Sequence, residues 1–329
     1  MEPMTRNPDA VAKAILEADT VAVCSHICPD GDTLGSALAM RLGLLSLGKK
    51  VSVFCDDKVP DNLSFLPGAE EVRKVRESDG PFDLMLAVDV SDAERLGTSR
   101  ILMKKSRNTA QIDHHPTNPL YMAVNSVDGK APASCNLIFE QLQTLGVPLT
   151  RDMAICLYAG ISTDTGNFSF SSTNAETFDV MRQLMEHDLP LSELSRILFR
   201  EKSREQILLL GKVISSLRYY ENGKIAVMKL TRKDFEDCGA LKEHADTLVN
   251  YGLETTGTEM ALLGREDEDG QIKFSLRAKS PNRINDIASA FGGGGHPQAS
   301  GVTLKGTLDE TTDRLLNAMI EKIKKQEQA

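Results

Sequence analysis

Short apolar runs alternate with helix-like segments through the first half of the chain, and this alternation constrains the fold more than any other feature. Strand-like runs cover residues 20–25, 50–55, 84–88 and a short stretch ending at Asp113, and a helical pattern over 33–47 follows the first. This order predicts an α/β domain with a largely parallel sheet. Further helices are expected at residues 136–145, 153–161 and 175–187.

The second half has a different texture. A charged helical stretch over 191–217 comes first, and it fits either a connection between domains or a packed surface helix. Because 329 residues exceed the usual size of one hydrophobic core, we predict two domains, 1–190 and 218–329, with 191–217 as a helical linker. The expected elements of the smaller, α+β domain are strands at 225–230, 259–264, 272–278 and 302–305, a hairpin turn over 264–271 and a helix at 283–291. The polar end of the chain, up to Ala329, is expected to fray.

Composition excludes several classes of function. The net charge of -9 and the absence of Trp argue against a protein that grips long duplex DNA or stacks many bases. The first residues carry scattered charges without the apolar block of a secretory signal, and every apolar stretch is shorter than the roughly 18 residues of a membrane span. The six cysteines form no CxxC pair, which is typical of buried free thiols. We therefore expect a cytoplasmic protein that binds no membrane.

The first strand-like run leads into a loop with three side chains that can bind metal, His26, Asp30 and Asp32. Loops beyond the carboxyl ends of parallel strands form the ligand crevice of an open α/β sheet. A dinucleotide-binding protein has a glycine-rich phosphate loop at this place. Carboxylates would repel phosphate there unless divalent cations lay between them. The loop thus predicts metal ligands, and the alternative is an aspartate that only caps the following helix.

Three later segments repeat the arrangement. Asp89 closes the run 84–88, Asp113-His114-His115 follows the short strand-like stretch, and Asp164 follows a buried-looking segment. An aspartate after a strand is, taken singly, usually a turn or cap residue. Since four separate segments bring Asp or His to one rim of one sheet, we predict a single metal site.

Taken together, HxxxDxD at 26–32, Asp89, the Asp113-His114-His115 triplet and Asp164 resemble the DHH phosphoesterase family. The sequence FGGGGHPQASG at 291–301 resembles the DHHA1 accessory domain of that family. The similarity spans nearly the whole chain and is nearest to the nanoRNase type, oligoribonucleases that also remove the 3′-phosphate from phosphoadenosine phosphate. It implies an N-terminal parallel-sheet α/β DHH domain and a smaller C-terminal α+β DHHA1 domain, joined by a helical linker.

The resemblance also implies a ligand set. One divalent cation is assigned to His26, Asp30 and Asp89, and a second to Asp32, Asp89, His114 and Asp164, so that Asp89 bridges the two. Asp113 is expected to orient a histidine, and His115 to face the substrate phosphate. Mixed imidazole and carboxylate ligands suit Mn²⁺. Two such cations can activate a shared water, so no nucleophilic side chain is needed.

The second domain contains a local basic patch. Between Gln271 and Gly306, Asp286 is the one acid among five basic residues: Lys273, Arg277, Lys279, Arg283 and Lys305. A glycine run lets backbone amides approach an anion, and the alternative is a loop that only turns a helix into a strand. The resemblance implies that a substrate phosphate binds Arg277 and His296, beside Gly293, Gly294 and Gly295, with Asn285 and Ser300 as weaker candidates.

These features predict a two-metal phosphoesterase that hydrolyses short oligoribonucleotides, dephosphorylates phosphoadenosine phosphate, or does both. The alternatives are a phosphodiesterase for cyclic or linear dinucleotides and a non-catalytic nucleotide sensor. Short RNA and nucleotides are the expected partners, and a homodimer is left open. Two further features stay open as well: Arg95 either lies on a helix surface or pairs with an acid near the metals, and Asp56-Asp57 fit a turn.

Overall fold

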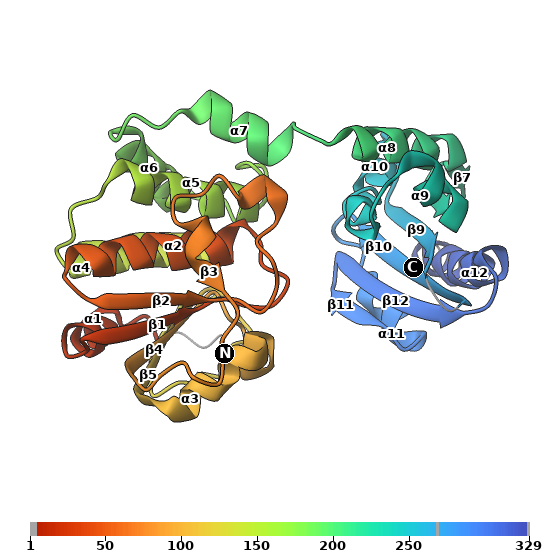
Figure 1. Ribbon diagram of the computed structural model, residues 1–329. Coiled ribbons are helices and arrows are strands. Elements are labelled where there is room, and N and C mark those ends of the chain that lie inside the picture. Colours follow the sequence, from red (N-terminus) through yellow and green to blue (C-terminus); the bar gives the residue numbers. More distant parts are fainter. Residues whose placement is uncertain (1–4, 268–269, 328–329) are drawn as a thin grey trace. The chain divides into compact units, whose positions relative to one another are not determined.

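The computed structural model describes residues 5–267 and 270–327 and shows two compact units, Met1–Glu201 and Lys202–Ala329 (Figure 1). The first is an α/β unit built on a parallel sheet, and the second is a smaller unit built on a mixed sheet. Both confirm the predicted fold class.

The sheet of the first unit has six strands in the order β3-β2-β1-β4-β5-β6, and all neighbouring pairs are parallel. Its strands are β1 (Thr20–Cys24), β2 (Lys50–Phe54), β3 (Val72–Arg73), β4 (Phe82–Val88), β5 (Ser106–Asp113) and β6 (Val124–Val127). The strand order reverses between β1 and β4. In open α/β sheets such a reversal marks the carboxyl edge at which ligands bind.

Strand register brings three of the predicted site residues to one level of this edge. Cys24 on β1 is paired with Ala87 on β4, and Ala87 is paired with Gln111 on β5. His26, Asp89 and Asp113 each lie two residues further along their strands. The three residues therefore leave the sheet side by side.

Each face of this sheet packs against its own hydrophobic cluster. The larger packs β1, β4 and β5 against α2 (Gly31–Ser46), α4 (Ser134–Thr144) and α5 (Arg151–Asp164). The smaller packs the alternate strand residues against η3 (Ala93–Ile101) and α3 (Leu102–Lys105). Most of α2 is buried, and a side chain at Gly35 would collide with the Cys156 carbonyl of α5. The close approach of α2 and α5 fixes where the ligands at their ends lie.

The remaining helices of the first unit lie around this core. They are α1 (Pro8–Leu16), η1 (Asp61–Leu63), η2 (Ala69–Glu71), α6 (Ala175–Met185) and α7 (Leu191–Phe199). Asn174 and Thr177 form a capping box at the start of α6, which accounts for the confirmed prediction of a helix from residue 175.

The second unit has a six-stranded sheet in the order β11-β12-β10-β9-β8-β7, in which β8 and β9 are parallel and the other pairs antiparallel. Its strands are β7 (Arg218–Tyr220), β8 (Ile225–Leu230), β9 (Met260–Glu266), β10 (Gln271–Ala278), β11 (Gly294–His296) and β12 (Ala299–Lys305). Its helices are α8 (Arg204–Ser216), α9 (Arg232–Cys238), η4 (Lys242–Ala245), α10 (Asn250–Leu253), α11 (Asn285–Ala290) and α12 (Leu308–Glu327).

Several expectations change in detail. The helical stretch over 191–217 is two helices, α7 in the first unit and α8 in the second, and Ser203 caps the start of α8. The expectation of a frayed C-terminal tail falls partly on residues 328–329, which lie outside the described residues; before them α12 continues to Glu327 and buries Leu315, Met319 and Ile323 on one side. The predicted hairpin turn over 264–271 includes residues 268–269, which lie outside the described residues.

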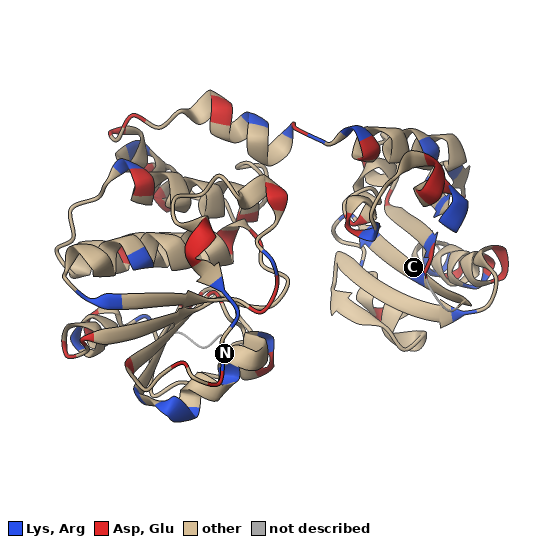
Figure 2. Ribbon diagram, in the orientation of Figure 1, with Lys and Arg blue, Asp and Glu red and all other residues tan. Residues whose placement is uncertain are grey.

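Lys and Arg are interspersed with Asp and Glu over the helices of both units (Figure 2), as the overall charge of -9 leads one to expect. Five cysteines are buried, and Cys28 is exposed. None of the helices in the described part of the chain is long and apolar enough to cross a membrane.

Candidate metal centre

The loop after β1 brings His26 and Asp30 together with Asp89 from the end of β4. His26 Nε2 lies 3.7 Å from Asp30 Oδ2 and 3.5 Å from Asp89 Oδ2. His26 Nδ1 lies 2.7 Å from the Ile27 carbonyl oxygen, which can only accept a hydrogen bond. Nδ1 therefore carries the proton and Nε2 faces the carboxylates. These three side chains form the group that was predicted for one cation.

Asp30 combines the two roles that the sequence left as alternatives. Its Oδ1 accepts hydrogen bonds of 3.1 Å from the backbone N–H groups of Asp32 and Thr33, so it caps α2. Its Oδ2 remains free of the cap and faces His26. The cap thus holds the second oxygen in place for a cation.

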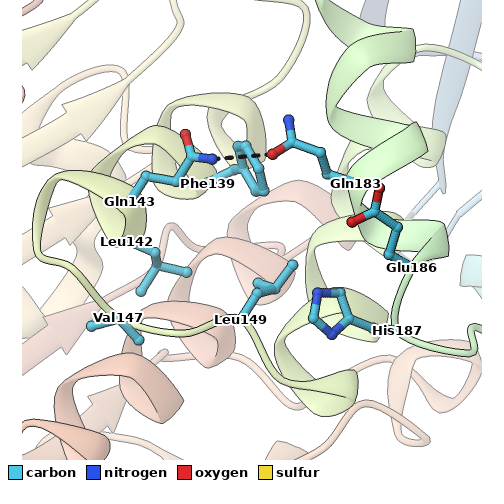
Figure 3. Close-up of a pocket in the computed structure, with 8 residues that line it drawn as sticks. All are labelled: Phe139, Leu142, Gln143, Val147, Leu149, Gln183, Glu186 and His187. Carbon is cyan, nitrogen blue, oxygen red and sulfur yellow. Dashed lines mark hydrogen bonds between the residues drawn. The ribbon is translucent and has the colours of Figure 1, made fainter.

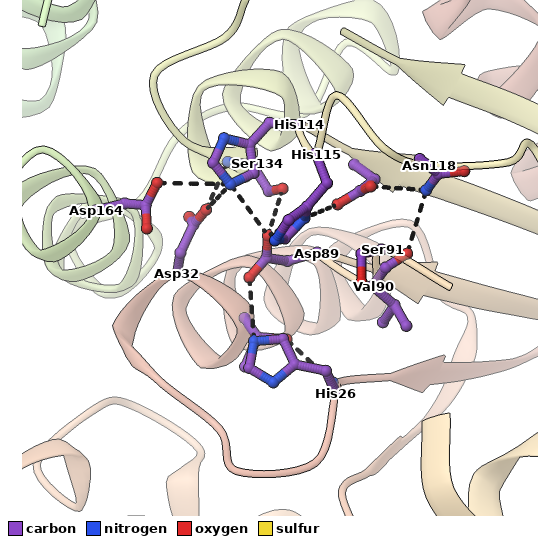
Figure 4. A network of polar contacts seen from close by, with 12 residues as sticks. His26, Asp32, Asp89, Val90, Ser91, His114, His115, Asn118, Ser134 and Asp164 are labelled. Atoms are coloured by element: carbon purple, nitrogen blue, oxygen red, sulfur yellow. Dashed lines mark hydrogen bonds and ion pairs between the residues drawn. The ribbon is translucent and has the colours of Figure 1, made fainter. Parts of the chain in front are cut away.

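His114 is the centre of the second group. Its Nε2 lies 3.8 Å from Asp32 Oδ2 and 3.5 Å from both Asp89 Oδ1 and Asp164 Oδ2 (Figure 4). Its Nδ1 lies 3.2 Å from the Ala131 carbonyl oxygen, which directs Nε2 to the carboxylates in the same way as in His26. Asp164 is the last residue of α5, and Asp32 lies in the first turn of α2.

Asp89 belongs to both groups. Its Oδ2 faces His26, its Oδ1 faces His114, and Ser134 Oγ donates a 2.8 Å hydrogen bond to Oδ1. The backbone of Asp89 has a φ of 57°, which turns the chain sharply out of β4, and Asp tolerates this region better than most residues. A carboxylate with one oxygen toward each group has the geometry of a bridging ligand.

The N-terminus of α4 holds Asp32. The backbone N–H groups of Ser134 and Cys135 donate to its two oxygens at 2.6 and 2.9 Å. Ala133, at the cap position of α4, has no side-chain oxygen for these donors. The Asp32 carboxylate takes that place from a distant part of the chain, and the helix dipole favours its negative charge.

Protons hold this centre together in the absence of cations. Burial lowers the pKa of His26, but Asp30 and Asp89 raise it to about 10. Burial likewise lowers the pKa of His114, and the surrounding carboxylates raise it to about 9. Burial and the neighbouring Asp89 raise the pKa of Asp32 well above its usual range. The carboxylates of this cluster thus stabilise positive charge on the two histidines.

This donor set fits divalent cations. Asp32 and Asp89 are 1% and 2% exposed, and no Lys or Arg among the described residues forms an ion pair with either. Buried carboxylates are costly unless a positive charge compensates them. Carboxylate oxygens and imidazole nitrogens are ligands that such cations accept. The acidic and histidine groups are therefore placed for divalent metals.

His115 and Asp113 form a pair beside this centre. His115 Nδ1 donates to Asp113 Oδ1 at 2.7 Å, and Asn118 Nδ2 donates to Asp113 Oδ2 at 2.6 Å (Figure 4). Burial raises the pKa of Asp113, but the hydrogen bonds from His115 and Asn118 lower it below its usual range. Burial lowers the pKa of His115, and Asp113 raises it above its usual value. Asp113 therefore stays ionised and fixes the His115 ring.

Two residues that the sequence did not single out support the pair. Asn118 is 2% exposed and also donates to the Val90 carbonyl at 3.2 Å, next to Asp89. Gln111 donates to the Asn118 side-chain oxygen at 3.1 Å. A signal was available: Asn118 follows the Asp113 triplet within a turn, and Gln111 is a polar residue inside a buried strand. Neither suffices without the fold.

Arg95 lies at the metal centre. Its Nη2 is 2.9 Å from His26 Nδ1. Neither alternative for Arg95 is confirmed. Its guanidinium reaches His26 and so does not serve only the helix surface. Among the described residues, Arg95 forms no ion pair with an acid. Asp56 and Asp57 hold loops instead: Asp57 Oδ2 accepts from Cys28 N at 2.7 Å, and Asp56 Oδ2 accepts from Thr98 N at 2.7 Å.

In the second unit, Arg277 and His296 share one face of the sheet. Arg277 on β10 and His296 on β11 are both paired with Ala299 on the strand between them. Residues directly opposite one another on antiparallel strands point to the same face. This face is the solvent-facing side of β10 and β12, and it also carries Lys273 and Lys305. Burial lowers the pKa of Arg277.

The other candidates in this unit lie differently. Ser300 is 5% exposed on the opposite face, where its Oγ donates to the His296 carbonyl at 2.9 Å. Asn285 begins α11, and its buried Oδ1 has no hydrogen-bond partner. A side chain at Gly293 or Gly295 would collide with backbone carbonyls of β12, whereas Gly294 faces open space. Close strand packing therefore accounts for Gly293 and Gly295, and the space at Gly294 leaves room for a ligand.

A separate pocket of about 190 Å³ lies between α4 and α6 (Figure 3). Its lining includes Leu142, Val147 and His187, and Gln143 Nε2 donates to Gln183 Oε1 at 3.2 Å across it. It contains none of the predicted site residues.

Comparison with known proteins gives the same picture. The model of the DHH family, N-terminal domain, matches residues 20–161, and that of the DHHA1 domain matches residues 221–325. A Thermus thermophilus protein named bifunctional oligoribonuclease and PAP phosphatase NrnA is 32% identical, over 92% of this chain and 90% of that protein. A Bacillus subtilis protein of the same name is 29% identical, over 91% and 93%.

A solved structure agrees as well. The crystal structure of an exopolyphosphatase-related protein from Bacteroides fragilis matches with a TM-score of 0.91 at 25% identity, covering 98% of this chain and 97% of that one. From the ligand geometry, the two matched domains and these relatives, we conclude that the chain belongs to the DHH family of phosphoesterases and carries a DHHA1 domain.

Proposed function

We propose that this protein hydrolyses very short oligoribonucleotides to mononucleotides and removes the 3′-phosphate from phosphoadenosine phosphate. The observation that carries the proposal is the position of Asp89, which directs one oxygen to the His26 group and the other to the His114 group. The names of the Thermus and Bacillus relatives support both activities. We assign catalysis to the first unit, and substrate binding to residues of both units.

His26, Asp30 and Asp89 would hold one divalent cation, and Asp32, Asp89, His114 and Asp164 would hold the other. Mixed nitrogen and oxygen ligands favour Mn²⁺. When bound, such cations supply Lewis acidity toward a phosphate oxygen and toward water. Ser134, Asp30's helix cap and the backbone of α4 keep the carboxylates in position for them.

The remaining chemistry belongs to His115. Its Nδ1 donates to Asp113 and lies 3.8 Å from Asp89 Oδ1, so its Nε2 is the ring nitrogen left to hold a proton for another partner. We assign to Nε2 a hydrogen bond to the substrate phosphate, and Asp113 keeps the ring in the required tautomer. The imidazolium form is favoured by Asp113 and Asp89, which suits contact with an anion.

We assign the second substrate contact to Arg277 and His296. Both lie on the same solvent-facing side of the sheet, with only the methyl group of Ala299 between them. Two cationic or hydrogen-bonding side chains across a small residue suit a terminal phosphate. Gly294 allows the backbone to come close to it. The phosphorylated metabolites and the five buried free thiols support a cytoplasmic site of action.

The test is hydrolysis by the purified full-length chain with Mn²⁺. The substrates are phosphoadenosine phosphate, a 5′-phosphorylated diribonucleotide, cyclic di-AMP, long single-stranded RNA and pyrophosphate. We expect turnover of the first two, and chelation of the metal should abolish it. Preferred hydrolysis of cyclic di-AMP would replace the proposal by a cyclic dinucleotide phosphodiesterase. Binding without hydrolysis of any substrate would leave only a sensor.

A further inference from the structure

The guanidinium of Arg95 reaches the metal centre without an acidic partner. Arg95 is half-buried on η3, and its Nη2 lies 2.9 Å from His26 Nδ1 and 3.5 Å from the Ile27 carbonyl oxygen. Its Nε is buried and has no hydrogen-bond partner among the described residues. Within the described residues no carboxylate forms an ion pair with Arg95, although four aspartates surround the two groups nearby. This is an unusual place for a permanent positive charge.

The contact with His26 does not satisfy the guanidinium. An arginine has only donors, so it needs an acceptor opposite each N–H. His26 Nδ1 already points its hydrogen at the Ile27 carbonyl oxygen, at 2.7 Å. That arrangement is the one that leaves Nε2 for a cation. When His26 serves as a ligand, Arg95 Nη2 faces an N–H group, and the acceptor left to it among the described residues is the Ile27 carbonyl oxygen at the long distance of 3.5 Å.

The backbone holds Arg95 where it is. Asp92 caps η3 and accepts hydrogen bonds from the N–H groups of Glu94 and Arg95 at 2.9 and 3.2 Å. The Arg95 carbonyl oxygen accepts a 2.8 Å hydrogen bond from Ile27 N, in the loop that carries His26. Gly97 turns the chain at a φ of 56°, where a side chain would collide with Asp56. The position of Arg95 is therefore coupled directly to the metal loop.

A cation beside a centre for divalent cations is unfavourable unless an anion lies between them. A guanidinium presents a planar fork of donors that matches two oxygens of a phosphate group. From this we infer that Arg95 binds a non-bridging phosphate oxygen of the substrate at the His26 side of the centre. The inference rests on the proposed function and adds a substrate-binding residue to it.

The first test compares Arg95→Gln, Arg95→Lys and Arg95→Ala with the unchanged chain on a 5′-phosphorylated diribonucleotide. Loss of a charge-assisted hydrogen bond should lower kcat/KM by about 10- to 100-fold for the Gln and Ala variants, mainly through a higher KM. Lys keeps the charge but not the fork, so it should recover part of the loss. Arg100→Ala is the matched control, because Arg100 lies on the same helix and pairs with exposed Glu94 at 2.5 Å. It should leave KM unchanged.

The second test needs no turnover. Calorimetry should show that Arg95→Ala binds adenosine monophosphate, in the presence of Mn²⁺, about 10-fold more weakly, while its affinity for Mn²⁺ alone stays equal or increases. Guanidinium ion at millimolar concentration should restore part of the activity of Arg95→Ala. A lower Mn²⁺ affinity with unchanged nucleotide binding would overturn the inference, since Arg95 would then act on His26. If the unchanged chain hydrolyses none of the substrates, the proposed function fails, and the nucleotide-binding comparison still decides the role of Arg95.

Discussion

The backbone N–H of Ser134 donates a 2.6 Å hydrogen bond to Asp32, a residue 102 positions earlier in the chain. Cys135 N donates to the other oxygen of the same carboxylate. One aspartate therefore caps helix α4 and also faces His114. The helix cap depends on the hydrogen-bonding oxygens of this side chain, whereas metal binding depends on its negative charge.

Substitutions of Asp32 should separate these two properties. Asp32→Asn keeps one acceptor for α4 but loses the charge and the second acceptor, so it should lose hydrolysis and lower the melting temperature of the metal-free protein less than Asp32→Ala does. Asp32→Ala removes the cap as well, and it should unfold with a free energy about 1 kcal/mol lower than that of Asp32→Asn. Thermal unfolding with chelator, together with a hydrolysis assay, checks both. Equal stability of the two variants would show that the cap contributes nothing.

Asp89→Asn should abolish the joint centre while keeping the fold. Asn tolerates the positive φ at this position, and its side chain still accepts from Ser134. Because substituting even an indirect partner of a metal ligand costs about 10- to 100-fold, we expect turnover to fall by more than about 100-fold. Asp152→Asn, exposed in the first turn of α5, is the control. Substantial remaining activity would mean that Asp89 does not bridge.

Asn118→Ala should lower kcat by about 10- to 100-fold with a smaller change in KM. The substitution leaves Asp113 without its second hydrogen bond and frees the His115 ring from its fixed orientation. The exposed Gln143–Gln183 pair offers a matched amide in Gln143→Ala, which should have no effect. If Asn118→Ala reduces only the melting temperature, the buried amide stabilises the fold and does not position His115.

Cation binding should release protons. His26 and His114 have pKa values of about 10 and about 9 in the metal-free protein, and each must lose a proton to become a ligand. At pH 7 we therefore expect release of about two protons from these histidines, with an affinity for Mn²⁺ that rises with pH. Calorimetry in buffers of different ionisation enthalpy measures the number. An affinity independent of pH between 6 and 9 would contradict it.

The same shifts predict how the metal-free protein responds to pH. Both histidine pKa values are raised above their ordinary value of 6.5, so the stability that they contribute is fully present below that pH. It is lost as the pH rises through about 9 and 10. Thermal unfolding with chelator should therefore show a falling melting temperature over this range, and Mn²⁺ should remove most of the fall.

His296→Ala and Arg277→Ala should each raise KM for phosphorylated dinucleotides by about 10-fold and change kcat little. Both side chains lie on the exposed face of β10, β12 and β11, away from the metal ligands in sequence. Lys273→Ala, on the same face but four residues from Arg277, serves as the control for net charge. If Lys273→Ala matches the other two, the effect is general electrostatics and not a phosphate site.

Much of the first unit follows from its sequence because apolar runs and the polar residues after them obey simple rules. The ends of β1, β4 and β5 carry His26, Asp89 and Asp113, and parallel pairing brings such ends together. The structure groups His26, Asp30 and Asp89 as the family resemblance implied for one cation, and it groups Asp32 and Asp164 with His114, as implied for the other. Asp30 shows the limit of such reasoning. The sequence offered a helix cap and a metal ligand as alternative roles for this residue, whereas one of its oxygens caps α2 and the other faces His26.

What the sequence did not reveal depends on contacts between distant segments. Nothing near Arg95 indicates that η3 turns it toward His26, because Gly97 interrupts the helical periodicity. The start of α4 did contain a signal, since Ala133 is a poor cap for a buried helix and implies a partner from elsewhere. The spacing of Leu315, Met319 and Ile323 likewise indicated an amphipathic helix, but the surrounding charge concealed it.

His26, Asp89 and Asp113 lie side by side only when β1, β4 and β5 pair in the native register. The geometry of the metal ligands His26 and Asp89 therefore depends on strand pairing. A slip of one residue between β1 and β4 would move the histidine away from its carboxylate, so the cations can recognise only the correctly registered sheet. Binding that selects the native state adds to its stability according to the free cation concentration. Metal binding would thus stabilise the correctly paired sheet over states with a shifted register, and so it would favour correct folding.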